Sequence, residues 1–131
     1  MKNWILFVGG LMGVLSIVIG ASGAHILGET VSKERMSIFE TGLDFHKFHA
    51  MLLVVLGISK WLVIDKNSQR MIVGSSFFAF IGILLFSFGM YAGVVTGNQS
   101  FYILNPFGGI CFMLSWGILM MWGFKGRTGE S

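Results

Sequence analysis

The sequence predicts an all-α integral membrane protein, a bundle of four transmembrane helices, from its composition and from the lengths of its apolar stretches. Of the 131 residues, 54% are hydrophobic and only 11% are charged, whereas a soluble domain has about 45–50% apolar and about 25% charged residues. Four charge-poor stretches reach the roughly 17–25 residues that a helix needs to cross a bilayer. The length indicates a single domain, residues 1–131.

The four predicted spans cover approximately residues 4–27, 48–64, 71–95 and 102–124. Each is continuously apolar and does not alternate between apolar and polar residues, which disfavours transmembrane strands. Because backbone groups in lipid must be satisfied within the segment, each span should be a helix. The stretch "DKNSQR" (65–70) is short enough to be a tight turn, so the second and third spans should be antiparallel neighbours.

Residues 28–47 form the one sizeable polar region, and they predict a short amphipathic helix between spans one and two. Ser32 is placed to be its N-cap, and a pair between Asp44 and Lys47 should face water or headgroups. We expect this helix to lie at the interface and to bend or run directly into span two. Its apolar residues recur at the three- and four-residue spacing of a helix face: Met36, Phe39 and Leu43.

The lysines and arginines predict the orientation, because cytoplasmic segments carry an excess of them. With four spans, both termini share a side with the 65–70 turn, and the opposite side has three cations offset by four carboxylates. We therefore expect both termini to be cytoplasmic. The side of the termini carries six of the nine cationic residues: Lys2, Lys60, Lys66, Arg70, Lys125 and Arg127.

A secretory signal is the competing interpretation of the first span. Lys2, an apolar stretch and "ASGA" (21–24) together imitate a signal peptide with a small-residue cleavage site. The apolar stretch is long for a signal core, and its small residues are patterned for packing. Cleavage would leave three spans in the same orientation.

The nineteen glycines predict close helix packing. Small residues let helix backbones approach one another in lipid, where no hydrophobic force drives association. They form one stripe in the first span and a similar one in the third, and we expect these stripes to face each other or a second copy of the chain. The packing glycines are Gly9, Gly13, Gly20 and Gly23 in the first span and Gly82, Gly89 and Gly93 in the third.

The three histidines are the candidate ligand- or proton-binding residues. His46 and His49 share a helix face at the start of span two, His25 closes span one, and Glu40 lies close by in sequence. Imidazole suits zinc, copper, iron and nickel, and it titrates near neutral pH, so a metal or haem site and a proton-sensing role are both open. The alternative, which we favour, is that the histidines form hydrogen bonds with backbone carbonyls and with each other. No cofactor is then expected.

Several functional classes are disfavoured. No basic stripe with interleaved aromatic residues is present, so a nucleic acid partner is not expected. A single cysteine, Cys111, forms neither an internal disulfide nor a thiolate cluster. The spans lack the deep acid or base that marks an ion pathway. Ser16, Ser75, Ser76 and Ser87 lie in apolar spans far in sequence from any histidine that could activate them. We therefore do not expect an enzyme, and a transporter is disfavoured.

Five short motifs in this order resemble the domain-of-unknown-function 423 family of small membrane proteins, which are relatives of transmembrane protein 256. They are "GASGAH" (20–25), "FETG" (39–42), "HKFHA" (46–50), "LFSFGMY" (85–91) and "NPFGG" (105–109). The resemblance spans about residues 4–123, with mild departures at Ser22, Phe88 and Asn105. It implies a multi-span protein of the bacterial plasma (inner) membrane. It also implies that the family's motif positions include His25, Glu40, His46, His49, Tyr91 and Pro106.

The sequence thus predicts a structural or accessory membrane protein that contacts the lipid bilayer. A homo-oligomer through the glycine stripes, or a complex with another membrane protein, is the expected assembly. The alternatives left open are a metal- or haem-binding protein that uses the outer-face histidines and a small transporter or channel.

Overall fold

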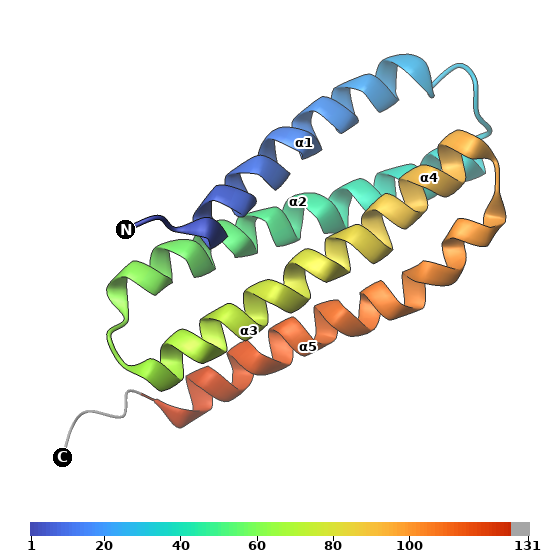
Figure 1. Ribbon diagram of the computed structural model, residues 1–131. Helices are drawn as coiled ribbons and strands as arrows, with labels where there is room; N and C mark the ends of the chain where they lie inside the picture. Colours follow the sequence, from blue (N-terminus) through green and yellow to red (C-terminus); the bar gives the residue numbers. More distant parts are fainter. Residues whose placement is uncertain (127–131) are drawn as a thin grey trace.

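The structure, a computed structural model, describes residues 1–126, and the regular structure in that range is helical. The π-helix η1 joins α3 to α4, and the 3-10 helix η2 leads into α5, so the segments form four long rods (Figure 1). All four rods are long and apolar enough to cross a membrane, which agrees with the predicted number of helices. The segments are α1 (Trp4–Ile26), α2 (Lys33–Leu62), α3 (Lys66–Gly82), η1 (Ile83–Ser87), α4 (Phe88–Thr96), η2 (Gln99–Ile103) and α5 (Leu104–Lys125).

The rods run alternately up and down, and each packs mainly on its neighbours in the chain. Figure 1 shows the amino terminus, the α2–α3 turn and the end of α5 at one end of the bundle, with the α1–α2 and α4–η2 connections at the other. Within residues 1–126, α1 packs on α2, α2 on α3 and α4, and α3 on α5, while α1 and α5 make no extensive contact. Helices α1 and α5 are therefore the outer members of the assembly.

Polar side chains fix where the helices begin. Asn3 accepts a hydrogen bond from the backbone N–H of Leu6, and Asp65 accepts one from that of Ser68. Ser32 caps α2 by accepting from the N–H of Arg35 over 3.2 Å, as predicted. Each bond satisfies one of the free N–H groups that the first turn of a helix leaves.

The amphipathic segment 28–47 runs directly into span two, as one of the two predicted arrangements has it, and is not a separate helix. Its residues from Lys33 onward are the first turns of α2, which continues without a break to Leu62. Gly42 in this part of α2 packs closely on α4, because a Cβ there would lie 3.1 Å from Cβ of Met90. The predicted apolar face is buried where expected: Phe39 is 3% exposed and packs with Met36 and Leu43 in one apolar cluster.

The two glycine stripes do not face each other, so that expectation was wrong. The stripe of the first span faces α2: a Cβ on Gly9 would lie 2.8 Å from the backbone N of Val54, and Gly20 and Gly23 lie against Leu43 and Phe39. The short connection between α1 and α2 makes α2, and not α3, the partner of α1. Gly13 has no such contact within 4 Å.

The stripe of the third span faces the last rod instead. Gly82 lies against the ring of Phe112, and Gly93 lies against the ring of Tyr102. A Cβ placed on Gly89 would lie 3.0 Å from Oδ1 of Asn105. These contacts lock α3, η1 and α4 onto η2 and α5.

Candidate functional site: the buried histidines

His49 is held between α2 and α5 by two hydrogen bonds. Its Nδ1 lies 2.8 Å from the carbonyl oxygen of Phe45, and the indole Nε1 of Trp116 donates to its Nε2 over 3.1 Å. A carbonyl only accepts and an indole N–H only donates. His49 must therefore carry its proton on Nδ1 and be neutral. Its ring also stacks on that of Phe112, with centroids 3.6 Å apart.

His46 turns toward α4 instead of α5. It is fully buried, and its Nδ1 lies 2.9 Å from the hydroxyl of Tyr91. The rings of Phe88 and Tyr91 pack on it. Its Nε2 is buried and has no hydrogen-bond partner among the described residues. One ring nitrogen thus links α2 to α4, and the other is buried without a partner.

The three histidines do not form a cluster. His25 is exposed in the last turn of α1, while His46 and His49 are buried and use different partner helices. Within residues 1–126 no group of three His, Cys, Asp or Glu side chains is placed to hold a metal ion. The metal or haem site at His25, His46 and His49, which the sequence left open as an alternative, is thus not assembled in this part of the chain. Sharing a helix face brought two histidines into the interior, but the side chains diverge from there.

Glu40 lies apart from the buried histidines. It is exposed on α2, one helical turn before Asp44, which forms the predicted pair with Lys47 over 3.4 Å. The side chains of that pair are 73% and 54% exposed, and exposed ion pairs contribute about 0–1 kcal/mol. The acidic residues at this end therefore belong to the outer surface and not to a site in the interior.

Arg35 is a tethering residue that the sequence did not single out. Its guanidinium donates a hydrogen bond to the carbonyl oxygen of Val94, which ties the start of α2 to the end of α4. Its Nε is buried without a partner. One signal was available: Arg35 lies one turn before Phe39, on the side of α2 that faces the bundle.

Several of the remaining buried polar groups also join neighbouring helices, whereas Ser16 and Ser76 bond carbonyls of their own helices and the Ser87 hydroxyl has no partner among residues 1–126. Ser75 and Ser115 lie 3.0 Å apart, and each hydroxyl reaches the backbone carbonyl of the other residue. Trp122 donates to the hydroxyl of Ser68, and the Asn3 amide donates to the carbonyl of Gly57. The hydroxyls of Ser75, Ser115 and Ser68 are thus engaged in contacts between helices.

These features define a polytopic α-helical membrane protein whose interior polar groups fasten one helix to the next. The profile of a family described as "Protein of unknown function (DUF423)" matches residues 19–109. The chain belongs to this family.

Relatives from distant bacteria extend over nearly the whole chain. The UPF0382 inner membrane protein YgdD of Escherichia coli is 26% identical over 92% of this chain and 88% of its own. A UPF0382 membrane protein of Haemophilus influenzae is 30% identical over 98% of this chain and 99% of its own. The UPF0382 membrane protein YwdK of Bacillus subtilis is 31% identical over 88% and 91%. No solved structure matches the chain.

Proposed function

We propose that this protein is a non-enzymatic accessory component of the bacterial plasma membrane that acts through a complex with itself or with another membrane protein. The observation that carries the proposal is the use of interior polar groups. His46, His49 and Ser75, which are the groups best suited to chemistry, each bond to a neighbouring helix. The interior therefore serves to hold the bundle together.

The outer helices supply the surface on which a partner would bind. We compare the most apolar 18 residues of each rod. Of these, 17% are buried in α1 and in the rod formed by η2 and α5, whereas 44% are buried in α2. The exposed side of α1 includes Val14 and Ile17, which are 59% and 72% exposed. Lipid covers such a surface in part, and close helix packing is the usual way for membrane helices to associate.

The charge distribution supports an orientation with both termini in the cytoplasm. Four cations in the described range flank the end that holds the amino terminus and the α2–α3 turn, and Lys125 ends α5 there. Arg127, which was counted with them, lies outside the described residues. The first half of α2, which begins at the other end, carries Lys33, Arg35 and Lys47, and these are offset by four acids in the α1–α2 connection and α2. The positive-inside rule then favours cytoplasmic termini.

The packing of α1 supports a first helix that is retained and not cleaved. Gly9 approaches the α2 backbone closely, and Asn3 donates a 2.7 Å hydrogen bond to the carbonyl of Gly57. Sequencing of the amino terminus of the protein purified from membranes tests this point. A new terminus just after "ASGA" (21–24) would contradict it.

Photo-crosslinking in intact membranes tests the accessory role. A benzophenone amino acid is placed at Val14 or Ile17 on α1 and, as a matched control, at Val55 on α2, which is 51% exposed. We expect one protein adduct of defined mass from α1 and lipid adducts alone from Val55. Lipid adducts alone from α1 and from Met113 on α5 would overturn the proposal. So would solute release from vesicles that contain the purified protein, because that result defines a channel.

The orientation is tested with cysteine labelling in a Cys111→Ser background. A cysteine at Asn67 in the α2–α3 turn should react with an impermeant maleimide only in inverted vesicles. One at Gln99 should react only in right-side-out vesicles. The opposite pattern would reverse the orientation without affecting the fold.

A further inference from the structure

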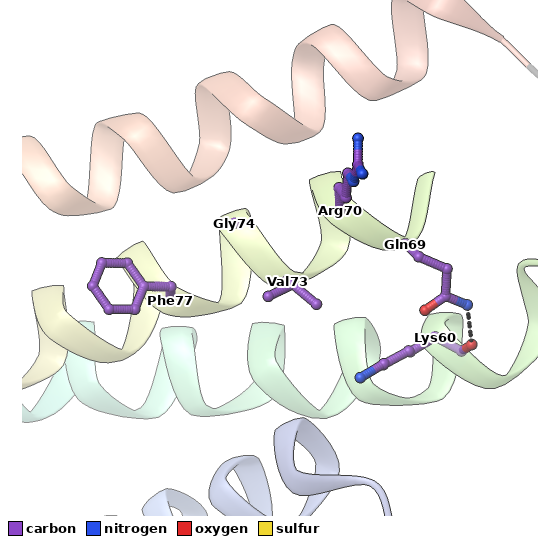
Figure 2. A pocket seen from close by; sticks show the side chains of 6 residues that line it. All are labelled: Lys60, Gln69, Arg70, Val73, Gly74 and Phe77. Carbon is purple, nitrogen blue, oxygen red and sulfur yellow. Dashed lines mark hydrogen bonds between the residues drawn. The ribbon is translucent and has the colours of Figure 1, made fainter. Parts of the chain in front are cut away.

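A groove of about 600 Å³ lies between α2 and α3 near the end that holds the amino terminus. Figure 2 shows its lining: Lys60 from α2 and Gln69, Arg70, Val73, Gly74 and Phe77 from α3. The two cations, Lys60 and Arg70, lie at one end of the groove, and apolar residues of α3 line the rest. Arg70 is followed one turn later by Val73 and Gly74 and two turns later by Phe77.

The two cations of the groove are not used by the protein itself. The one ion pair of the described residues joins Asp44 and Lys47, at a distant part of α2. Asp65, the acid closest in sequence to both, accepts the backbone N–H of Ser68 as the cap of α3. Lys60 and Arg70 therefore have no carboxylate partner within residues 1–126.

Gln69 fixes the frame that carries these cations. Its amide nitrogen donates to the carbonyl of Lys60 over 2.8 Å and also to that of Val63. The dashed line in Figure 2 marks the first of these bonds. The last turn of α2 is thereby tied to the first turn of α3, so Lys60 and Arg70 start from backbones that are fixed relative to each other.

The apolar part of the groove faces the bilayer. Val73 is 46% exposed and Phe77 is 58% exposed, whereas a Cβ on Gly74 would lie 3.6 Å from Cδ1 of Ile118 in α5. A chain of methylene groups lying there would be in contact with α3, while a negative group at its end would reach the level of Arg70 and Lys60.

We propose that this groove binds a phospholipid with an anionic headgroup. The anionic headgroup would lie at the level of Lys60 and Arg70, whose side chains extend to different sides of α3 in Figure 2 and would turn toward it, and one acyl chain would lie along Val73, Gly74 and Phe77. Charge complementarity carries the choice of occupant. Five cations of the described range (Lys2, Lys60, Lys66, Arg70 and Lys125) gather at this end, and Asp65 is the one acid among them in that range. Basic pockets between transmembrane helices are known to select anionic headgroups.

The test is lipid binding by native mass spectrometry of the delipidated protein, with phosphatidylglycerol compared against phosphatidylcholine of identical chains. We expect the anionic lipid to bind more tightly. We expect the Lys60→Gln/Arg70→Gln variant to lose about tenfold in affinity for it. The matched control, Lys66→Gln/Lys125→Gln, removes two charges from the same end but none from the groove, and it should bind within twofold of the wild type.

A conservative variant keeps the test decisive if the neutralised protein is poorly folded. Lys60→Arg/Arg70→Lys keeps both charges and should retain binding, and thermal melting in lipid-free detergent checks each variant. Equal binding of the two lipids, or equal loss in both neutralised variants, would overturn the proposal. Displacement of the lipid by millimolar inorganic phosphate would assign the site to a soluble phosphate and would also overturn it.

Discussion

Trp116 in α5 donates a hydrogen bond from its indole Nε1 to Nε2 of His49 in α2, over 3.1 Å. The backbones of these two helices make little direct contact, so the bond bridges them through side chains. Phe45, Phe48 and Phe112 pack around the pair. The same contacts line a groove of about 490 Å³ between α2 and α5, which is open toward the bilayer.

Replacing the donor should destabilise the bundle. Trp116→Phe keeps an aromatic ring but leaves Nε2 of His49 buried without a partner. Hydrogen bonds between membrane helices contribute on average about 0.6 kcal/mol and at most about 1.7 kcal/mol, and an orphaned buried acceptor costs about 1–3 kcal/mol. We expect a loss of about 1 kcal/mol in the free energy of unfolding, measured by titration with a denaturing detergent.

The control for this substitution is Trp61→Phe. Trp61 is 60% exposed, and its indole makes no hydrogen bond within the described residues. The loss from Trp61→Phe should be smaller by at least half. Equal losses from the two substitutions would show that the bond to His49 contributes nothing. Nitrogen NMR of the histidine rings gives a second readout, because His49 should carry its proton on Nδ1.

Gly57 should tolerate no side chain. A Cβ there would lie 2.7 Å from both N and Cα of Leu6 in α1, and backbone atoms cannot move aside as a side chain does. Overpacking of this kind typically costs about 1–3 kcal/mol. We expect Gly57→Ala to lower the free energy of unfolding by about 2 kcal/mol in the same titration.

The matched control is Gly117→Ala in α5. No heavy atom lies within 4 Å of a Cβ placed there, and alanine favours a helix over glycine by up to about 1 kcal/mol. Gly117→Ala should therefore be neutral or stabilising. If Gly117→Ala is destabilising and Gly57→Ala is neutral, α1 does not pack closely on α2 at Gly57.

Much of the fold could be predicted from the sequence, because its main constraint is local. An apolar stretch in lipid must satisfy its own backbone hydrogen bonds, so length and composition were enough to predict four helices. Capping is also local, and Ser32 was identified from its residue type and position. The pair of Asp44 and Lys47 followed from their spacing on one helix.

Which side chains meet across helices could not be predicted in the same way. A stripe of glycines shows that some backbone approaches, but not which one, and the α1 stripe faces α2 instead of α3. His46 and His49 share a face, yet their partners, Tyr91 and Trp116, come from two helices far along the chain. Periodicity carries no information on the rotation of one helix against another.

Lowering the pH should weaken the cap of α3. The backbone N–H and the hydroxyl of Ser68 both bond the carboxylate of Asp65, so the pKa of Asp65 is lowered from its ordinary value. A lowered pKa means that the stabilisation is present above the unfolded-state pKa, about 3.9, and is lost as the pH falls through the folded-state pKa. Asp65→Asn keeps an acceptor but does not titrate.

We therefore expect the wild type to lose more thermal stability than Asp65→Asn when the pH is lowered from 7 to 3. The measurement is the difference in melting temperature between the two proteins at each pH. The size of the effect should be modest, because Asp65 is in contact with solvent. A difference that does not change with pH would show that the carboxylate does not cap α3 in its charged form.

Elemental analysis should find no stoichiometric metal in the purified protein. His25 is exposed and separate from the two buried histidines, each of which already has a hydrogen-bond partner. We expect well under one equivalent of zinc, copper, iron or nickel per chain in mild detergent, and the same value for His25→Ala. One equivalent in the wild type that His25→Ala abolishes would show that the histidines come together around a metal.

The contact between His46 and Tyr91 should be among the most costly polar contacts to break. Tyr91→Phe removes the hydroxyl that lies 2.9 Å from Nδ1 and leaves both ring nitrogens of a fully buried histidine without partners. A buried polar group that loses its partner costs about 1–3 kcal/mol. We expect Tyr91→Phe to lower the free energy of unfolding by about 1.5 kcal/mol.

Tyr102→Phe is the matched control, because its hydroxyl makes no hydrogen bond within the described residues, and it should change the free energy of unfolding by less than about 0.5 kcal/mol. The double variant His46→Leu/Tyr91→Phe separates the bond from the packing. When both partners become apolar no polar group is left unsatisfied, so this variant should recover part of the loss from Tyr91→Phe. If it is instead as unstable as the two single substitutions added together, His46 and Tyr91 act independently and the hydrogen bond does not stabilise the bundle.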